Sequence, residues 1–241
     1  MGYGWRGRIG LLVPSSNTTL ESEFWRMVPA GVSVHTARMR LLSNTVEENI
    51  NMEKYAMESA IDLSTAKVNV IAYGCTSGSF VGGQQWEADL TQKLTSTTGL
   101  PVITASMAVV NALKSLKVTR ISVVTPYPED INQREKAFFE GAGFDIVKIG
   151  GLSFRDNVEV GLQEPSATFK IAKDSFEIDA EALFISCTNL RTIDIIDVLE
   201  KDFGKPVVTS AQALMWAVLH KLKVSDQITH YGTLLREHLA R

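Results

Sequence analysis

The sequence predicts an α/β protein of two open parallel-sheet domains related by a pseudo-twofold axis. Short apolar runs of strand length alternate with segments of helical periodicity along the 241 residues, a pattern typical of βα units. The order of these segments also repeats, because Ile9 and Cys75 recur as Ile121 and Cys187, in both cases 112 positions further along the chain. A constant offset across different residue types indicates a duplication, and two copies of a βα pattern predict two parallel sheets.

The first half begins with an apolar strand over residues 8–13, which ends in the polar turn 14–19 (Pro-Ser-Ser-Asn-Thr-Thr). This turn is rich in residues that favour the position before a helix. A helix is therefore expected over 20–27, where Glu21 and Glu23 in the first turn complement the positive end of the helix dipole.

The same alternation continues through the rest of the first half. Residues 32–39 alternate apolar and polar side chains, which predicts a strand, and 51–66 carries apolar residues at helical spacing. Residues 68–74 form an apolar run, which predicts a buried strand that ends at Cys75. A helix, a strand and a second helix follow over 85–97, 102–104 and 108–116.

The second half begins again at residue 120. Residues 120–127 copy the first strand and its turn, and 182–187 copy the strand that precedes Cys75. Further helices are expected over 131–141, 168–178 and 193–203, and further strands over 144–149 and 206–211.

A change of offset marks a deletion in the second copy. Pro101 and Pro206 precede the last strand of each copy and are 105 positions apart, so the second copy has lost about seven residues after its cysteine. We assign residues 1–112 to the first domain and 113–211 to the second, with a C-terminal helix over 212–241 completing the first. The tail from Ser225 reads as a short amphipathic helix at the surface.

Composition and charge exclude several classes of protein. A net charge of −3 offers no basic surface for nucleic acid. No apolar stretch reaches the roughly 20 residues of a membrane span, and the N-terminus lacks the apolar core of a secretory signal. We therefore expect a cytoplasmic protein without nucleic-acid or membrane partners, and a homodimer or larger homo-oligomer.

No cofactor or metal is expected. Gly82-Gly83 lacks the Gly-x-Gly-x-x-Gly pattern of a dinucleotide site, and the four histidines show no metal-ligand spacing with either cysteine. Two cysteines form no disulfide framework, so Cys75 and Cys187 are either ordinary buried cysteines or a catalytic pair.

The position of the two cysteines favours catalysis. Each stands beside a threonine at the carboxyl end of a predicted strand, which is the edge where open α/β sheets bind ligands. If the halves face each other, Cys75 and Cys187 enter one cleft from opposite sides. A helix N-terminus after each turn is expected to lower the thiol pKa, so that one cysteine attacks or deprotonates while the other delivers a proton.

Several motifs resemble the maleate cis-trans isomerases of the aspartate/glutamate racemase superfamily. The resemblance covers nearly the whole chain, and its most specific part is Pro-Ser-Ser-Asn-Thr-Thr combined with two strand-end cysteines. The segments that carry it are 13–23, 35–40, the two cysteine turns and 155–157. Gly74 to Ser77, 125–132 and Ser186-Cys187 are also similar to arylmalonate decarboxylases, which keep the second cysteine and have glycine in place of Cys75.

The resemblance implies a role for each motif. Cys75 would add to the alkene of maleate to give a succinyl-cysteine, and Cys187 would supply and later remove a proton, so that fumarate is released. Asn17, Tyr127 and Asn157 match the substrate-binding positions of the family. Backbone and hydroxyl groups of the two cysteine turns would complete two anion pockets, from Thr76 and Ser77 on one side and from Thr188 and Asn189 on the other.

Three alternatives stay open. Thr76-Ser77-Gly78 replaces the bulkier apolar residues of the isomerases and is similar to the oxyanion pocket of the decarboxylases. A decarboxylase of substituted malonates, in which Cys187 alone protonates the product, or a racemase would use the same two turns. A binding protein for a small carboxylate would use the cleft without turnover. The expected ligand in every case is a small carboxylate, a dicarboxylate first.

Overall fold

The computed structural model describes residues 2–239. The first half of the chain contains β1 (Gly7–Pro14), α1 (Leu20–Met27), β2 (Val32–Met39), α2 (Val46–Thr65), β3 (Val70–Tyr73), α3 (Thr76–Phe80), α4 (Gly83–Thr98), β4 (Val102–Thr104) and α5 (Ala105–Ser115). The second half contains β5 (Arg120–Thr125), α6 (Glu129–Gly141), β6 (Asp145–Gly151), α7 (Asn157–Gly161), α8 (Pro165–Ser175), β7 (Ala182–Ile185), α9 (Ile196–Phe203), β8 (Val207–Thr209), α10 (Ser210–Lys221) and α11 (Gly232–Glu237).

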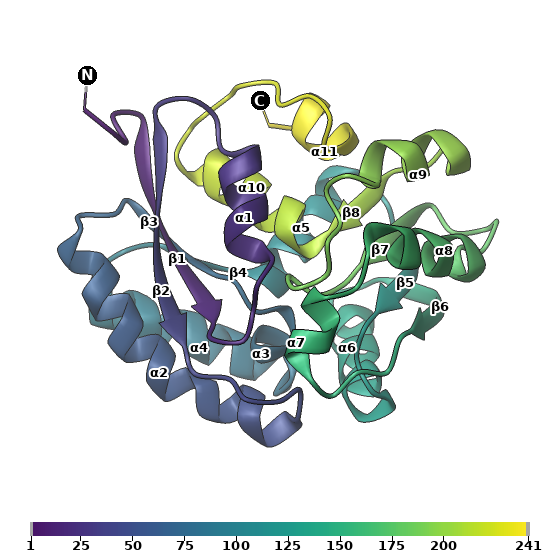
Figure 1. Cartoon of the computed structure of the whole chain (residues 1–241), viewed down its shortest axis with the longest axis horizontal. Helices are drawn as coiled ribbons and strands as arrows, with labels where there is room; N and C mark the ends of the chain where they lie inside the picture. The colour runs from purple at the N-terminus through teal and green to yellow at the C-terminus, as the bar shows by residue number, and fades with distance from the viewer. Residues whose placement is uncertain (1, 240–241) are drawn as a thin grey trace.

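These strands form two four-stranded parallel sheets that lie side by side with helices around them (Figure 1). The strand order is β2-β1-β3-β4 in one sheet and β6-β5-β7-β8 in the other, so equivalent strands occupy equivalent places. The predicted α/β fold of two open parallel sheets is therefore confirmed. No helix within residues 2–239 is both long and apolar enough to cross a membrane.

The duplication extends to the pairing of individual residues. Ile9 on β1 pairs with Val70 on β3, and Ile121 on β5 pairs with Ala182 on β7, so both partners are shifted by 112 positions. The predicted deletion falls in the helix after the second cysteine, because α9 has 8 residues where α4 has 16. The segment between the cysteine and that helix is one residue longer in the second copy, because α4 begins 8 positions after Cys75 and α9 begins 9 positions after Cys187.

The structure differs from the predicted elements at three places before the C-terminal segment. Helix α2 begins at Val46 and not at residue 51, because the Thr45 hydroxyl accepts a hydrogen bond from the Glu48 N–H and caps it. The turn after Cys75 is the short helix α3. An additional helix, α7, begins at Asn157 behind the side-chain cap of Asp156, in a segment where the sequence predicted no helix.

Helices α5 and α10 pack against each other between the two halves (Figure 1). Helix α10 also contacts α1, β3 and β4 of the first half and β8 of the second, and most of its side chains are buried. Apolar residues on every face explain that position, since such a helix needs cover on all sides. The core therefore runs continuously from one half into the other.

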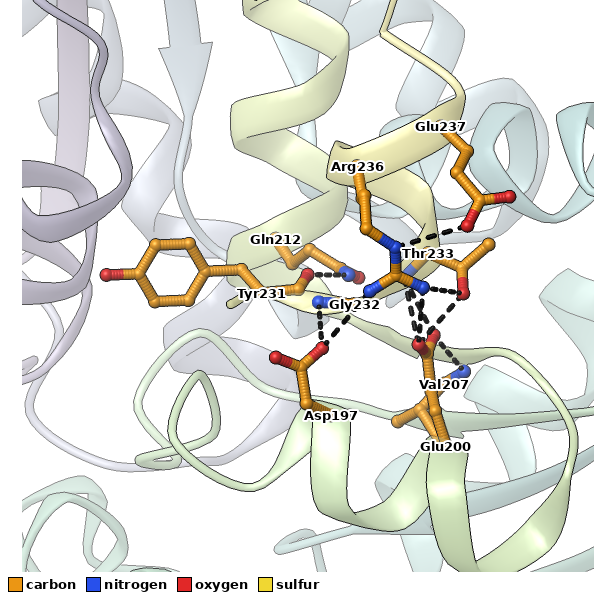
Figure 2. Close-up of polar contacts among 9 residues, drawn as sticks. All are labelled: Asp197, Glu200, Val207, Gln212, Tyr231, Gly232, Thr233, Arg236 and Glu237. Atoms are coloured by element: carbon orange, nitrogen blue, oxygen red, sulfur yellow. Dashed lines mark hydrogen bonds and ion pairs between the residues drawn. The ribbon is translucent and has the colours of Figure 1, made fainter. Parts of the chain in front are cut away.

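The C-terminal segment is two helices and not one helix over 212–241, because α10 ends at Lys221 and α11 begins at Gly232. Figure 2 shows how α11 is fixed to α9 of the second half. The Glu200 carboxylate accepts hydrogen bonds from the backbone N–H of Thr233 (2.9 Å) and from that of Val207 (3.1 Å), and Asp197 accepts one from Gly232 (2.9 Å). The assignment of residues 212–241 to the first domain stays a prediction. The domain boundaries after residues 112 and 211 also stay predictions.

Helix α6 carries a buried acid, Glu135, whose side chain is 1% exposed. Neither of its carboxyl oxygens has a hydrogen-bond partner among the described residues. Burial raises the pKa of Glu135 from 4.5 to about 8, and the nearby Ser186 hydroxyl only partly opposes this. Glu135 is therefore a neutral acid in the folded protein at neutral pH.

This raised pKa predicts a loss of stability with rising pH. Between pH 4.5 and 8 the folded protein binds one proton more at Glu135 than the unfolded chain, so the free energy of unfolding falls as pH rises through this window. Glu135→Gln keeps the shape but cannot ionise. We expect it to match the wild type at pH 5 and to be more stable at pH 8, by a difference on the order of 4 kcal/mol.

Chemical denaturation of both proteins at pH 5 and pH 8 measures this difference. Glu140→Gln is the matched control, because Glu140 is an exposed acid on the same helix and pairs only with Lys136. A Glu135→Gln variant whose stability relative to wild type does not change with pH would show that Glu135 is solvated.

Candidate active site

All nine residues that the sequence predicted for the site line a single cavity where the carboxyl ends of the strands of both sheets meet. They are Asn17, Cys75, Thr76, Ser77, Tyr127, Asn157, Cys187, Thr188 and Asn189. The cavity is tight, because its free volume of about 10 Å³ is the space that one water molecule needs. The remaining lining residues are Pro14, Leu41 and Asn44.

The turn after β1 holds Asn17 in one orientation. The Asn17 Oδ1 accepts hydrogen bonds from the backbone N–H of Thr19 and of Leu20, both 2.9 Å, and so caps α1. The Arg38 guanidinium donates to the Asn17 carbonyl (2.7 Å) and pairs with Glu21. With its oxygen committed to the helix, Asn17 has only its amide N–H groups to offer toward the cavity.

Thr188 connects the two cysteine turns. Its hydroxyl donates to the carbonyl oxygen of Gly74 (2.9 Å), the residue before Cys75, and accepts from the Asn17 Nδ2 (3.2 Å). Because this hydroxyl has given its one hydrogen to the protein, Thr188 could bind an anion only through its backbone N–H. The equivalent hydroxyl of Thr76 is buried and has no partner among residues 2–239.

Cys75 is buried at the first turn of α3, where its sulfur accepts from the backbone N–H of Gly78 (3.4 Å). Ser77 lies 3.6 Å from the same sulfur, but its hydroxyl donates to the Oδ1 of Asn49 (2.8 Å). The Cys75 thiol also points toward that oxygen, at 3.9 Å. Burial raises the pKa of Cys75, while the Gly78 N–H and Ser77 oppose the rise.

Cys187 stands in a different backbone environment. Its φ of 91° lies in the left-handed region that favours glycine, and its N–H donates to the Ser210 hydroxyl at the start of α10 (3.1 Å). The sulfur accepts from the backbone N–H of Asn189 (3.3 Å). Burial raises the pKa of Cys187 to about 12, although Asn189 and the Tyr127 hydroxyl lower it.

The expected lowering of both thiol pKa values is wrong. A backbone N–H does stabilise each thiolate, but burial outweighs that effect at Cys75 and more strongly at Cys187. No helix directly follows Cys187 either, since α9 begins only at Ile196. Both cysteines are consequently thiols at neutral pH, and Cys75 is the one that ionises more readily.

Tyr127 and Asn157 complete the second-half side of the cavity. Burial, together with the nearby sulfurs of Cys187 and Cys75, raises the pKa of Tyr127 well above its usual value, so its phenol stays a hydrogen-bond donor. The Asn157 Nδ2 donates to the Ser16 hydroxyl (2.9 Å), and its carbonyl accepts from the Asn189 amide (2.5 Å). The α7 turn is thereby held against the β1 turn.

Sequence reasoning missed Leu41, Asn44 and Asn49. The first two follow β2, whose carboxyl end lies at the same edge as those of β1 and β3, so the rule that placed the other turns could have found them. The Asn44 N–H donates to the Arg155 carbonyl (2.8 Å), which joins this loop to the segment before α7. Asn49 lies within α2 and had no such signal.

The described residues contain no group of three or more His, Cys, Asp or Glu side chains placed to hold a metal ion.

Comparison with known proteins identifies the family. A family model for arylmalonate decarboxylase matches residues 9–235. The chain belongs to the arylmalonate decarboxylase family. Within this family it is 30% identical to a maleate isomerase from Pseudomonas putida, over 95% of this chain and 96% of that protein. It is 31% identical to the arylmalonate decarboxylase of Bordetella bronchiseptica, over 86% of this chain and 87% of that one.

Solved structures agree with this assignment. A Nocardia farcinica maleate cis-trans isomerase, solved as a cysteine-to-serine mutant with a covalently bound succinylcysteine intermediate, superimposes with a TM-score of 0.91 at 27% identity. The match covers 96% of this chain and 98% of the other. The predicted resemblance to both the isomerases and the decarboxylases is therefore confirmed.

The contacts of Asn49 predict how the pKa of Cys75 is set. In the thiol state the Ser77 hydroxyl donates to Asn49, and it could donate to a Cys75 thiolate only by leaving that oxygen. Asn49→Leu removes the competing acceptor and frees Ser77 for the thiolate. We expect the pKa of Cys75 to fall by about one unit, because a hydrogen bond to the charged form favours it.

Titration of thiolate ultraviolet absorbance in a Cys187→Ser background measures this pKa. Asn51→Leu is the control, because Asn51 lies on the exposed side of the same helix. In the wild-type chain, which keeps both thiols, Cys75 should ionise at a lower pH than Cys187. A Cys75 pKa that is unchanged in Asn49→Leu would contradict the proposed competition for the Ser77 hydroxyl.

Proposed function

We propose that the protein is a cofactor-independent cis-trans isomerase that converts maleate, or a similar small cis-unsaturated dicarboxylate, to fumarate. The observation that carries the proposal is the pair of cysteines, which enter one small cavity from equivalent strand ends of the two halves. A duplicated site with two different thiols suits a reaction that needs a nucleophile and a proton donor at neighbouring carbons.

Before the first step Cys75 loses its proton to solvent, and the thiolate then adds to one alkene carbon. The electron pair of the double bond moves onto the neighbouring carbon and its carboxylate, and the Cys187 thiol protonates that carbon. The product is a succinyl group on Cys75 and a thiolate at Cys187. The surroundings of the two sulfurs support these roles, because the Gly78 N–H and the Ser77 hydroxyl lie within reach of the Cys75 sulfur, whereas burial raises the pKa of Cys187 and keeps it protonated.

In the second step the former double bond is single and rotates. The Cys187 thiolate removes a proton from the carbon that it protonated, and the electron pair re-forms the alkene while the Cys75–carbon bond breaks. Fumarate leaves with both cysteines restored, so no proton or electron is gained or lost. The succinylcysteine named for the Nocardia farcinica mutant is the intermediate that this sequence of steps requires.

The polar lining supplies the remaining roles. The Tyr127 phenol is a neutral donor near both sulfurs, where negative charge develops on the substrate. Thr76 offers its hydroxyl on the Cys75 side, where Ser77 offers only its backbone N–H because its hydroxyl donates to Asn49. Asn17 and Asn157 offer amide N–H groups from the facing turns. Thr188 contributes through its backbone.

A malonate decarboxylase or a racemase is the alternative, favoured by the family match and by the polar turn after Cys75. Decarboxylation would need only Cys187 to protonate the product, so a Cys75→Ala variant would still turn over phenylmalonate. A binding protein for small carboxylates would be stabilised by its ligand and would turn over none of these compounds.

Location and assembly also stay predictions. A reducing cytoplasm fits two free, buried cysteines. A homodimer or larger homo-oligomer fits the large apolar side chains at the surface, among them Trp25 and Leu162. Light scattering of the purified protein would determine the oligomeric state.

The isomerase proposal predicts that the protein converts maleate to fumarate without added cofactor. Proton NMR follows the reaction directly, because the alkene protons of the two isomers differ in chemical shift. We expect Cys75→Ala to reduce the rate by at least about 10³-fold, since the residual site has no nucleophile. Maleate that remains unchanged at high protein concentration would remove this function, and phenylmalonate turnover would then support the alternative.

The proposed order of steps also predicts where a covalent adduct forms. Cys187→Ser lacks the thiolate that removes the proton in the second step, so once solvent has protonated the neighbouring carbon the succinyl group should remain on Cys75. Mass spectrometry of the intact protein and of its peptides identifies the modified residue. Cys75→Ser is the matched control and should carry no adduct. An adduct on Cys187 in that control would reverse the two roles.

A further inference from the structure

Asn44 carries the one side-chain amide on the cavity wall whose nitrogen is buried without a hydrogen-bond partner among the described residues. Its side chain is 2% exposed, so bulk solvent does not reach it. Only its backbone N–H is bound, to the Arg155 carbonyl. A buried amide donor without a partner destabilises a folded protein unless a ligand supplies the acceptor.

The other cavity amides do not share this property. Asn17 donates to Thr188, Asn157 donates to Ser16, and Asn189 donates to the Asn157 carbonyl. Their orientation is therefore fixed by contacts within the protein. The Asn44 amide nitrogen has no such contact. We therefore take a bound molecule that accepts a hydrogen bond as its partner.

A second orphaned donor lines the same cavity. The Thr76 hydroxyl is 1% exposed and also lacks a partner among residues 2–239, and it directly follows Cys75. Asn44 lies in the loop after β2 and Thr76 is the first residue of α3, both at the carboxyl edge of the first sheet. Together they offer N–H and O–H donors next to the nucleophile, and no lysine, arginine or histidine lines the cavity.

We propose that Asn44 and Thr76 form the binding subsite for the carboxylate next to the carbon that Cys75 attacks, and that Asn44 thereby determines specificity for a dianionic substrate. This inference rests on the proposed function for the identity of the reacting carbon. A carboxylate suits the subsite because its two oxygens only accept hydrogen bonds, which matches two donors that lack acceptors. Neutral donors can bind an anion in a buried site because their dipoles are fixed.

The subsite also explains which molecules are rejected. A half-ester or a cis monoacid presents a weaker acceptor or none to Asn44, and its binding would leave the amide unpaired. Sites built to hydrogen-bond a substrate group discriminate strongly against an analogue without that group. Replacing Asn44 by leucine, which has nearly the same shape, should remove this discrimination.

The binding experiment uses the full chain with Cys75→Ser and Cys187→Ser, so that maleate binds without reacting. Calorimetric titration with maleate compares this parent with the same chain carrying Asn44→Leu. We expect the dissociation constant to rise by about 10- to 100-fold, the range for losing hydrogen bonds to a charged group. Dimethyl maleate, which has no carboxylate to place against Asn44, should bind the two chains almost equally.

Thermal unfolding without ligand separates binding from a structural role. Because the Asn44 amide has no partner in the protein, Asn44→Leu should leave the ligand-free chain at least as stable as its parent. A structural role would instead lower the stability. Asn51→Leu, an exposed position on α2, is the matched control and should change neither stability nor maleate affinity.

In the active enzyme, Asn44→Leu should raise KM for maleate by a similar factor and change kcat less. Equal maleate affinity in the Asn44→Leu chain and its parent would contradict the proposal that Asn44 binds a carboxylate. So would a parent chain that binds none of maleate, succinate and phenylmalonate. Absence of fumarate alone would overturn the proposed function, whereas the titration would still decide whether Asn44 binds a carboxylate.

Discussion

The hydroxyl of Thr188 is the contact on which the arrangement of the site depends. It donates to the Gly74 carbonyl of the first half and accepts from the Asn17 amide, so it fixes the second cysteine turn directly to the backbone beside Cys75. Asn17 is fixed in turn, because its oxygen caps α1. Together with the hydrogen bonds of Thr18 and Thr19 to Asn189, this hydroxyl holds the two halves together at the place where their thiols must act on neighbouring atoms.

The two cysteines are equivalent in sequence but not in chemistry. Cys75 begins a short helix, and a backbone N–H and a serine hydroxyl lie within reach of its sulfur. Cys187 is buried without a following helix, and its pKa rises to about 12. The duplication therefore supplied two thiols at matching positions, and the divergence of the two turns made one easier to ionise. A reaction that needs one thiolate and one thiol benefits from that difference.

The sequence was sufficient for the fold and for most of the cavity, because both depend on local patterns. Strand-length apolar runs fixed the sheets, and the 112-residue offset placed Cys75 and Cys187 at equivalent strand ends. The features that the sequence did not predict depend on contacts between distant segments. Each of them forms only when loops from several elements are in place. They are the hydrogen bonds of the Thr188 hydroxyl, the unpartnered amide of Asn44 and the contacts of Asn49. The direction of the thiol pKa shifts depends on burial, which no motif reports.

The backbone at Cys187 carries a consequence for how this protein can change over generations. A non-glycine residue with φ near 91° costs on the order of 1–3 kcal/mol, whereas glycine adopts that conformation without strain. Substitution by glycine would relieve this strain and remove the acid, and it would also leave a gap where the buried sulfur packs. The strained backbone is therefore kept together with the thiol that the proposed reaction uses. In a lineage that no longer uses the reaction, Cys187 should be among the first residues of the site to drift.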